Sequence, residues 1–236
     1  MGEVADIYRL TKKTPDLFWN EYVCRPVAAV VVLAVRGTRV TPNQITLAAF
    51  VVAMAGAGLL VALPGHLGLL IAIVVFQLSY VLDCADGMLA RLRGTQSIKG
   101  GLFDFLMDEI KAFVMLAATA LRLFREDPDP RYLMLGLIGL VCLASGVALT
   151  TFLRRPEIAG PLEPGATAPA ASRSLVRRAV GVVESGAKFL IHYPSYILYA
   201  AVAGRIEVYF YPYVAVNALY FVRALGQVAM RFGRAG

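Results

Sequence analysis

The chain has 236 residues, of which 58% are hydrophobic and only 17% are charged. Soluble domains carry about 25% charged residues, so this composition excludes an ordinary water-soluble domain and favours an integral membrane protein. The formal net charge is +7, and on a membrane chain a basic excess reports orientation and contact with anionic lipid headgroups. No basic stretch is studded with aromatic residues, so we expect no nucleic-acid partner.

The N-terminal segment contains an apolar stretch at residues 26–35 that is too short to span a bilayer, which takes about 20 residues. Aromatic and basic residues bracket this stretch, which favours an amphipathic helix lying in the membrane interface. After it, Thr41 and Pro42 are typical of a helix N-cap and a first helical residue. We therefore expect the first spanning helix to begin there.

Six apolar stretches follow, and together they predict an all-α integral membrane fold. It would have six transmembrane helices, preceded by the N-terminal interfacial amphipathic helix. We divide the chain into a cytoplasmic N-terminal segment with that helix, residues 1–40, and a six-span domain, residues 41–236. Residues 154–188 predict a loop, because their first half, PEIAGPLEPGATAPAASRS, is rich in Pro, Ala and Gly. The predicted spans lie near residues 44–63, 66–90, 102–124, 132–153, 188–203 and 206–230.

The distribution of basic residues predicts the orientation. If both termini are cytoplasmic, 17 of the 23 Lys and Arg residues lie in cytoplasmic segments and four lie in the opposite loops. Positively charged loops stay on the cytoplasmic side, so we expect a multi-pass protein with both termini in the cytoplasm.

Four aspartates interrupt the apolar pattern at the cytoplasmic ends of the second and third predicted spans: Asp83, Asp86, Asp104 and Asp108. The spacing within each pair, three and four residues, places its members on one helical face. Ionisable residues inside a membrane are costly and are by default candidates for function. Oxygen ligands without nearby His or Cys indicate hard cations such as Mg²⁺ or Mn²⁺. The alternative is that nearby basic residues simply neutralise the aspartates. Lys111, one turn after Asp108, is interpreted as a counter-ion rather than a catalytic group.

The same stretch resembles the complete signature of the class I CDP-alcohol phosphotransferase family, and the spacings match without a gap. The resemblance extends more loosely to the interfacial helix, to residues 41–43 and to the six-span plan. The signature residues are Asp83, Asp86, Gly87, Ala90, Arg91, Gly100, Asp104 and Asp108.

The resemblance implies a membrane enzyme that moves a phosphatidyl or other phospho-alcohol group from a CDP-linked donor to an alcohol, releasing CMP. Two Mg²⁺ or Mn²⁺ ions would be held by the four aspartates, with Asp108 also serving as the catalytic base. Relatives commonly form homodimers, and one is expected here. The residues implied to contact the CDP moiety are Thr41, Asn43, Gly87, Ala90, Arg91 and Ser97.

The acceptor is less strongly indicated, with inositol phosphate or glycerol 3-phosphate leading. Arg154, Arg155 and Arg223 are candidates for binding an acceptor phosphate, but ordinary positive charge on the cytoplasmic side explains the first two equally well. The donor would be CDP-diacylglycerol, an ether lipid analogue or CDP-inositol, in a bacterial or archaeal-type membrane. The alternative function is a divalent-cation transporter, which would also place acidic residues within spans.

Overall fold

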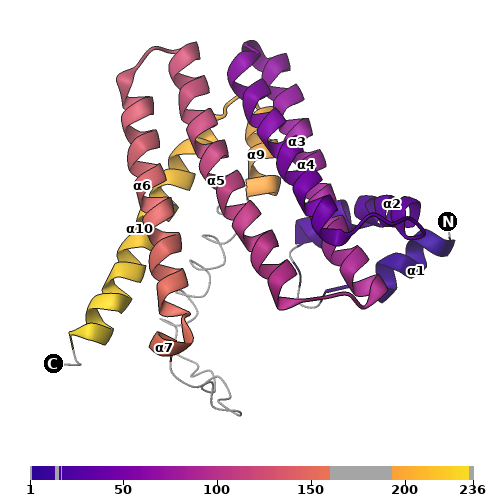
Figure 1. The fold of residues 1–236 in the computed structure, drawn as a ribbon. Coiled ribbons are helices and arrows are strands. Elements are labelled where there is room, and N and C mark those ends of the chain that lie inside the picture. The colour runs from indigo at the N-terminus through magenta and orange to yellow at the C-terminus, as the bar shows by residue number, and fades with distance from the viewer. Residues whose placement is uncertain (1, 14–15, 17, 160–192, 234–236) are drawn as a thin grey trace, which may run out of the picture.

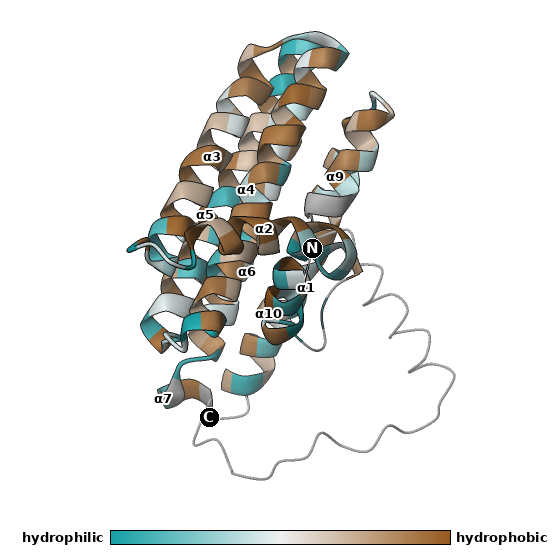
Figure 2. Cartoon of the chain, turned by 90° about the vertical axis from the view of Figure 1, so that its right-hand side faces the viewer, coloured by the Kyte–Doolittle hydropathy of each residue, from teal (hydrophilic) through white to brown (hydrophobic). Residues whose placement is uncertain are grey.

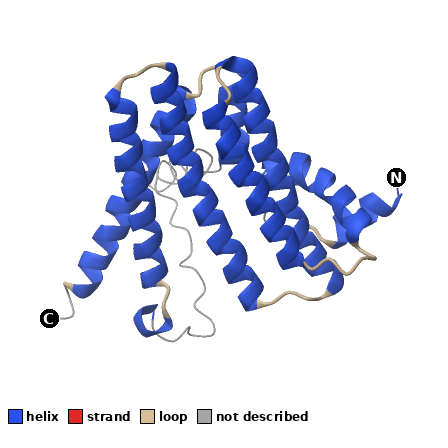
Figure 3. Cartoon of the chain, turned by 45° about the horizontal axis from the view of Figure 1, so that its top comes forward, coloured by secondary structure: helices blue, strands red, loops and turns tan. Residues whose placement is uncertain are grey.

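The computed structural model describes residues 2–13, 16, 18–159 and 193–233 (Figure 1). Within these ranges every regular element is a helix, which confirms the expected all-α fold (Figure 3). In chain order the elements are α1 (Gly2–Leu10), the π-helix η1 (Asn20–Cys24), α2 (Arg25–Val35), α3 (Pro42–Ala62), α4 (Gly65–Arg93), α5 (Ile98–Glu126), α6 (Pro130–Leu153), α7 (Pro156–Ala159), α9 (Tyr193–Val202) and α10 (Glu207–Phe232).

Five long helices, α3 to α6 and α10, form the main bundle. α3 packs against α4 and α5, α6 packs against α5 and α10, and the shorter α9 lies against α4. The α3–α4 and α5–α6 turns lie at one end of the bundle, while the α4–α5 loop and the last turn of α6 lie at the other (Figure 1). Hydrophobic residues predominate along the long helices, as expected for segments surrounded by lipid (Figure 2).

Four helices of the described residues are long and apolar enough to cross a membrane: α3, α4, α6 and α10. They coincide with four of the six predicted spans. α5 is 29 residues long and packs between neighbours, but eight charged residues interrupt its apolar pattern. The span predicted at 188–203 is described only from residue 193, where α9 has ten residues. An all-α membrane fold is therefore found with four candidate spans rather than six, and from residue 160 onward the predicted 154–188 loop lies outside the described residues.

α1 and α2 lie beside the bundle, and α2 runs across α4 (Figures 1 and 2). The face of α2 that carries Ala28, Ala29 and Val32 is fully buried, whereas Val27 and Val30 are exposed. An amphipathic helix embedded in the membrane interface remains a prediction for this segment. The buried residues of α1, η1 and α2 form, with the second half of α4, a hydrophobic cluster separate from the core of the main bundle.

The start of α3 confirms the predicted cap. Thr41 Oγ1 accepts the Gln44 N–H at 3.3 Å, and Gln44 Oε1 accepts the Thr41 N–H at 2.9 Å. This reciprocal capping box satisfies two backbone donors that a helix N-terminus otherwise leaves without partners. It fixes the entry of α3 into the bundle at Pro42.

Arg93, in the last turn of α4, holds the loop between α2 and α3. Its guanidinium donates to the carbonyl oxygens of Val35 at 2.9 Å, Thr38 at 3.0 Å and Val40 at 2.5 Å. Backbone carbonyls in a loop need such partners when they turn away from water. The end of α4 therefore fixes the chain that leads into α3.

Arg122 plays the corresponding part at the other end of the bundle. Its side chain is buried on α5 and donates to the carbonyl oxygens of Leu60 at 3.0 Å, Leu63 at 2.9 Å and Gly65 at 2.7 Å. Its charge is balanced by Glu126, at 2.6 Å. The α3–α4 turn is thereby tied to α5.

Candidate active site

The aspartates lie where α4 ends and α5 begins. Gly94 ends α4 in the left-handed conformation, with φ 63°, which glycine adopts without steric cost. The N–H of Thr95 bonds back to the carbonyl oxygen of Ala90 at 3.0 Å, and this arrangement closes the helix. Ser97 then begins α5 by accepting the Gly100 N–H at 3.0 Å. The short, capped connection brings the end of α4 beside the first turns of α5.

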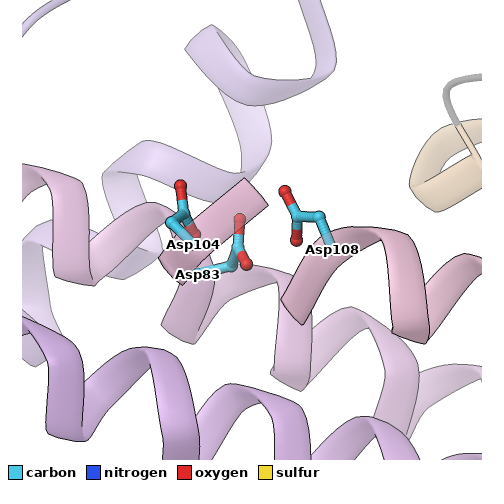
Figure 4. A group of neighbouring side chains, drawn as sticks. All are labelled: Asp83, Asp104 and Asp108. Atoms are coloured by element: carbon cyan, nitrogen blue, oxygen red, sulfur yellow. The ribbon is translucent and has the colours of Figure 1, made fainter. Parts of the chain in front are cut away.

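Asp83, Asp104 and Asp108 form a carboxylate cluster between the two helices (Figure 4). One oxygen from each residue lies within 4.8 Å of the others. The Asp83 side chain is 13% exposed and that of Asp108 is 46% exposed, so Asp108 is the more accessible to solvent and to a substrate. The predicted convergence of the two pairs is confirmed for these three aspartates.

The cluster has the properties of a divalent-metal site. All its ligand atoms are carboxylate oxygens, the donors that Mg²⁺ and Mn²⁺ prefer. Asp104 Oδ1 is buried and has no hydrogen-bond partner among the described residues. A buried carboxylate oxygen without a partner is costly, and a bound cation would supply one. The residues present therefore fit the metal that the motif implies.

Lys111, on α5, is a buried cation in contact with the cluster. Its ammonium forms ion pairs with Asp83 and with Asp108, the latter at 2.6 Å, and its side chain is 1% exposed. The predicted counter-ion is thus in contact with two of the aspartates, one on each helix.

Asp86 lies outside the three-carboxylate cluster. It is buried one turn further along α4, and its Oδ2 accepts a hydrogen bond from Thr46 Oγ1 on α3. Asp86 and Asp104 both line a pocket at this end of the bundle. Asp104 therefore connects the cluster to the pocket that Asp86 faces.

This pocket has a volume of about 180 Å³ and opens beside the α4–α5 loop. Four of the predicted CDP-binding residues line it: Gly87, Ala90, Arg91 and Ser97. Thr41 and Asn43 are not among the lining residues, but the Asn43 side chain lies next to Gly100, which is one of them. The pocket and the carboxylate cluster thus adjoin one another, and both motif helices contribute to them.

Arg91 has its guanidinium beside Gly87, at the wall of the pocket. Its Nε donates to the carbonyl oxygen of Thr11 at 2.9 Å, so the segment that follows α1 helps to aim the side chain. A half-buried guanidinium held at a pocket wall is suited to binding phosphate oxygens.

The predicted acceptor residues lie apart from this pocket. Arg154 and Arg155 follow the last turn of α6 and are exposed, and Arg154 interacts electrostatically with Glu109, the neighbour of Asp108. Arg223 is exposed on α10. Arg154 is therefore linked to the first half of α5.

Sequence reasoning missed Thr46, which lies one helical turn after Pro42 and also lines the pocket. A signal was present, because positions four apart share a helical face and Pro42 marks the start of α3. Thr95 and Gln96, in the α4–α5 loop, were missed as well. Loop residues carry no periodic pattern that would place them.

Apolar helices that end in a carboxylate cluster and an adjoining polar pocket define a membrane protein with a candidate metal site at one end of its bundle. The chain belongs to the CDP-alcohol phosphatidyltransferase family, whose model matches residues 39–206. It is accordingly a transferase of phospholipid biosynthesis, and the predicted family is confirmed.

Curated relatives carry the name bifunctional IPC transferase and DIPP synthase. The protein from Archaeoglobus fulgidus is 33% identical over 110 residues, which is 47% of this chain and 21% of the relative. The protein from Rubrobacter xylanophilus is 39% identical over 84 residues, 36% of this chain and 18% of the relative. The chain thus matches about a fifth of the length of these relatives.

A solved structure with a similar fold is the Mycobacterium tuberculosis phosphatidylinositol phosphate synthase PgsA1 with CDP-DAG bound. The TM-score is 0.53 at 20% sequence identity, and the match covers 88% of this chain and 94% of the other. At this identity the similarity establishes the fold.

Proposed function

We propose that this enzyme transfers a phosphatidyl or other phospho-alcohol group from a CDP-linked donor to an alcohol acceptor and releases CMP. The observation that carries the proposal is the cluster of Asp83, Asp104 and Asp108 within 4.8 Å, adjoining a pocket lined by Arg91 and Asp86. A diphosphate donor needs positive charge beside its phosphates and a pocket for its nucleotide. Metal ions held by the aspartates, together with Arg91, would supply the charge, and the adjoining pocket would receive the nucleotide.

Asp83, Asp86, Asp104 and Asp108 would hold two Mg²⁺ or Mn²⁺ ions. When bound, such ions neutralise the charge on phosphate oxygens and polarise the phosphorus centre. Arg91 would donate to the diphosphate from the pocket wall, and Gly87 and Ala90 would let the nucleotide approach the backbone of α4. Ser97 would meet it from the start of α5, and Thr41 and Asn43 from the start of α3.

Asp108 is proposed as the general base. It is the more exposed of the two aspartates that pair with Lys111, so an acceptor hydroxyl has access to it. Asp108 would take the hydroxyl proton as the acceptor oxygen bonds to phosphorus and the bond from phosphorus to the CMP oxygen breaks. Proton transfer to a positioned carboxylate of this kind contributes about 10²- to 10⁴-fold to a rate.

The acceptor is proposed to be inositol phosphate or glycerol 3-phosphate. Support comes from the names of the similar proteins, which include a phosphatidylinositol phosphate synthase and IPC transferases. Arg154 and Arg155, with Arg223, would bind the acceptor phosphate. The donor is proposed to be CDP-diacylglycerol, with an ether lipid analogue or CDP-inositol as the alternatives.

We further propose six spans with α5 and the 188–203 segment included, an N-terminal interfacial helix, and an active site that opens to the cytoplasm in a bacterial or archaeal-type membrane. The basic residues on that side support this orientation. A homodimer is proposed from the family alone. A divalent-cation transporter would place carboxylates along a path, whereas the four aspartates gather at one end of α4 and α5.

The test is CMP release by the purified protein with CDP-diacylglycerol and Mg²⁺, across a panel of inositol phosphate, glycerol 3-phosphate, inositol and glycerol. The proposal expects release that requires both metal and one acceptor. An Asp83→Asn variant that still unfolds cooperatively, and is therefore folded, serves as the inactive control. Flux of divalent cations into vesicles that contain the protein, without CMP release from any CDP donor, would favour the transporter.

A further inference from the structure

The carboxylate cluster contains a cation of its own. Lys111 is 1% exposed, and its ammonium is paired with Asp83 on α4 and with Asp108 on α5, at 2.6 Å for the second contact. Both partners are among the three aspartates whose oxygens converge within 4.8 Å. The lysine therefore contacts the same carboxylates that would bind metal.

A buried ammonium is stable only when anionic partners compensate for its lost hydration. Conversely, adjacent carboxylates repel one another unless a cation lies between them. Lys111 satisfies both requirements, because it joins one carboxylate from each helix and is carried on α5 itself. It holds Asp83 and Asp108 together through a covalently attached charge, which neither dilution nor a chelator can remove.

We propose that Lys111 is a positioning residue that competes with divalent cations for Asp83 and Asp108, and so limits the metal affinity of the site while keeping its two helices together. The inference rests on the metal site of the proposed function. Two effects act in the same direction. The ammonium repels an incoming divalent cation, and it occupies carboxylate oxygens that the cation would bind.

Lys111→Met tests this role, because methionine has a similar length and no charge. We expect two changes in thermal unfolding of the purified protein. In EDTA the variant should unfold at a lower temperature than the wild type, since Asp83 and Asp108 then face each other without a cation. The Mg²⁺ midpoint is the Mg²⁺ concentration that gives half of the rise in unfolding temperature seen at the highest Mg²⁺ concentration tested. In the variant this midpoint should fall by roughly tenfold or more, because repulsion between the ammonium and Mg²⁺ is large enough for such a change even at an effective dielectric of about 20.

Arg122→Met is the matched control. Arg122 is the other buried cation of α5, at the opposite end of the bundle, and it binds backbone carbonyls and Glu126. Its loss should lower the unfolding temperature equally in EDTA and in Mg²⁺, and should leave the Mg²⁺ midpoint unchanged. Lys111→Gln, which keeps hydrogen bonding to the carboxylates without the charge, provides the same test if the methionine variant does not fold.

An unchanged or higher Mg²⁺ midpoint in both Lys111 variants would overturn the inference. CMP release by the wild-type protein is measured in parallel and tests the proposed function separately. A lowered midpoint without CMP release from any CDP donor would leave the role of Lys111 supported and the proposed reaction wrong. CMP release with an unchanged midpoint would do the opposite.

Discussion

Thr46→Val tests whether a hydroxyl on α3 positions Asp86 for the reaction. Both side chains are buried, and Thr46 Oγ1 donates to Asp86 Oδ2. Oγ1 also lies 3.2 Å from the carbonyl oxygen of Pro42, but its single proton is directed to the carboxylate, because charge-assisted hydrogen bonds are the stronger ones. Valine has nearly the shape of threonine without the donor. The change therefore removes one hydrogen bond and leaves the packing in place.

The expected loss follows from the energy of that bond. A hydrogen bond to a charged group contributes about 1.5 to 3 kcal/mol, and here the acceptor is 5% exposed, so water cannot readily replace the donor. If this energy holds Asp86 in its working orientation, kcat/KM for the CDP donor should fall by about 10- to 100-fold.

The assay is CMP release with varied CDP-diacylglycerol, measured beside thermal unfolding. Thr119→Val is the control, because the Thr119 hydroxyl is equally buried but donates to the carbonyl oxygen of Met115 within α5, at 2.8 Å. The control should lose some stability and little activity. If Thr46→Val released CMP as fast as Thr119→Val, the positioning role of Thr46 would be refuted.

Three further predictions concern the reaction. Asp108→Asn should keep metal-dependent stabilisation by a CDP compound while turnover falls by about 10²- to 10⁴-fold, whereas Asp83→Asn should lose both. Near-normal turnover by Asp108→Asn would mean that another group takes the proton. Replacing Arg154 and Arg155 together by Gln should raise KM for a phosphorylated acceptor more than KM for the donor, and an equal rise would leave them as topological charges. EDTA should abolish CMP release and excess Mg²⁺ should restore it, while release that persists after exhaustive chelation would exclude a metal-dependent mechanism.

The parts of the fold that depend on neighbouring residues in the chain were predictable from the sequence. Thr41 and Pro42 mark the start of α3 because capping and a fixed φ act within one helical turn. α3, α4, α6 and α10 were found because hydropathy reports what faces lipid. α5 shows the limit of that reasoning. An apolar stretch predicted a span at residues 102–124, but the charged residues that serve the site and the neighbouring helices keep α5 out of the four candidate spans, so its crossing of the membrane stays a prediction.

In the site, too, features set by the local sequence were predictable and features set by helix packing were not. Convergence of Asp83, Asp104 and Asp108 could be inferred, because a short loop between two helices forces their adjoining ends together. The Thr46 to Asp86 contact could not, since it depends on how far α3 is rotated against α4. Likewise, spacing suggested that Lys111 would meet Asp108, but its second partner, Asp83, depends on the packing of α4 against α5.

The hydrogen bonds from Arg93 to the α2–α3 loop have a consequence for biogenesis. The carbonyl oxygens that it binds, at Val35, Thr38 and Val40, precede it by 53 to 58 residues. At a synthesis rate of about 5 to 20 residues per second, they wait roughly 3 to 12 seconds for their partner. During that interval the first span can enter the membrane, but the loop that leads into it still lacks the hydrogen bonds from Arg93.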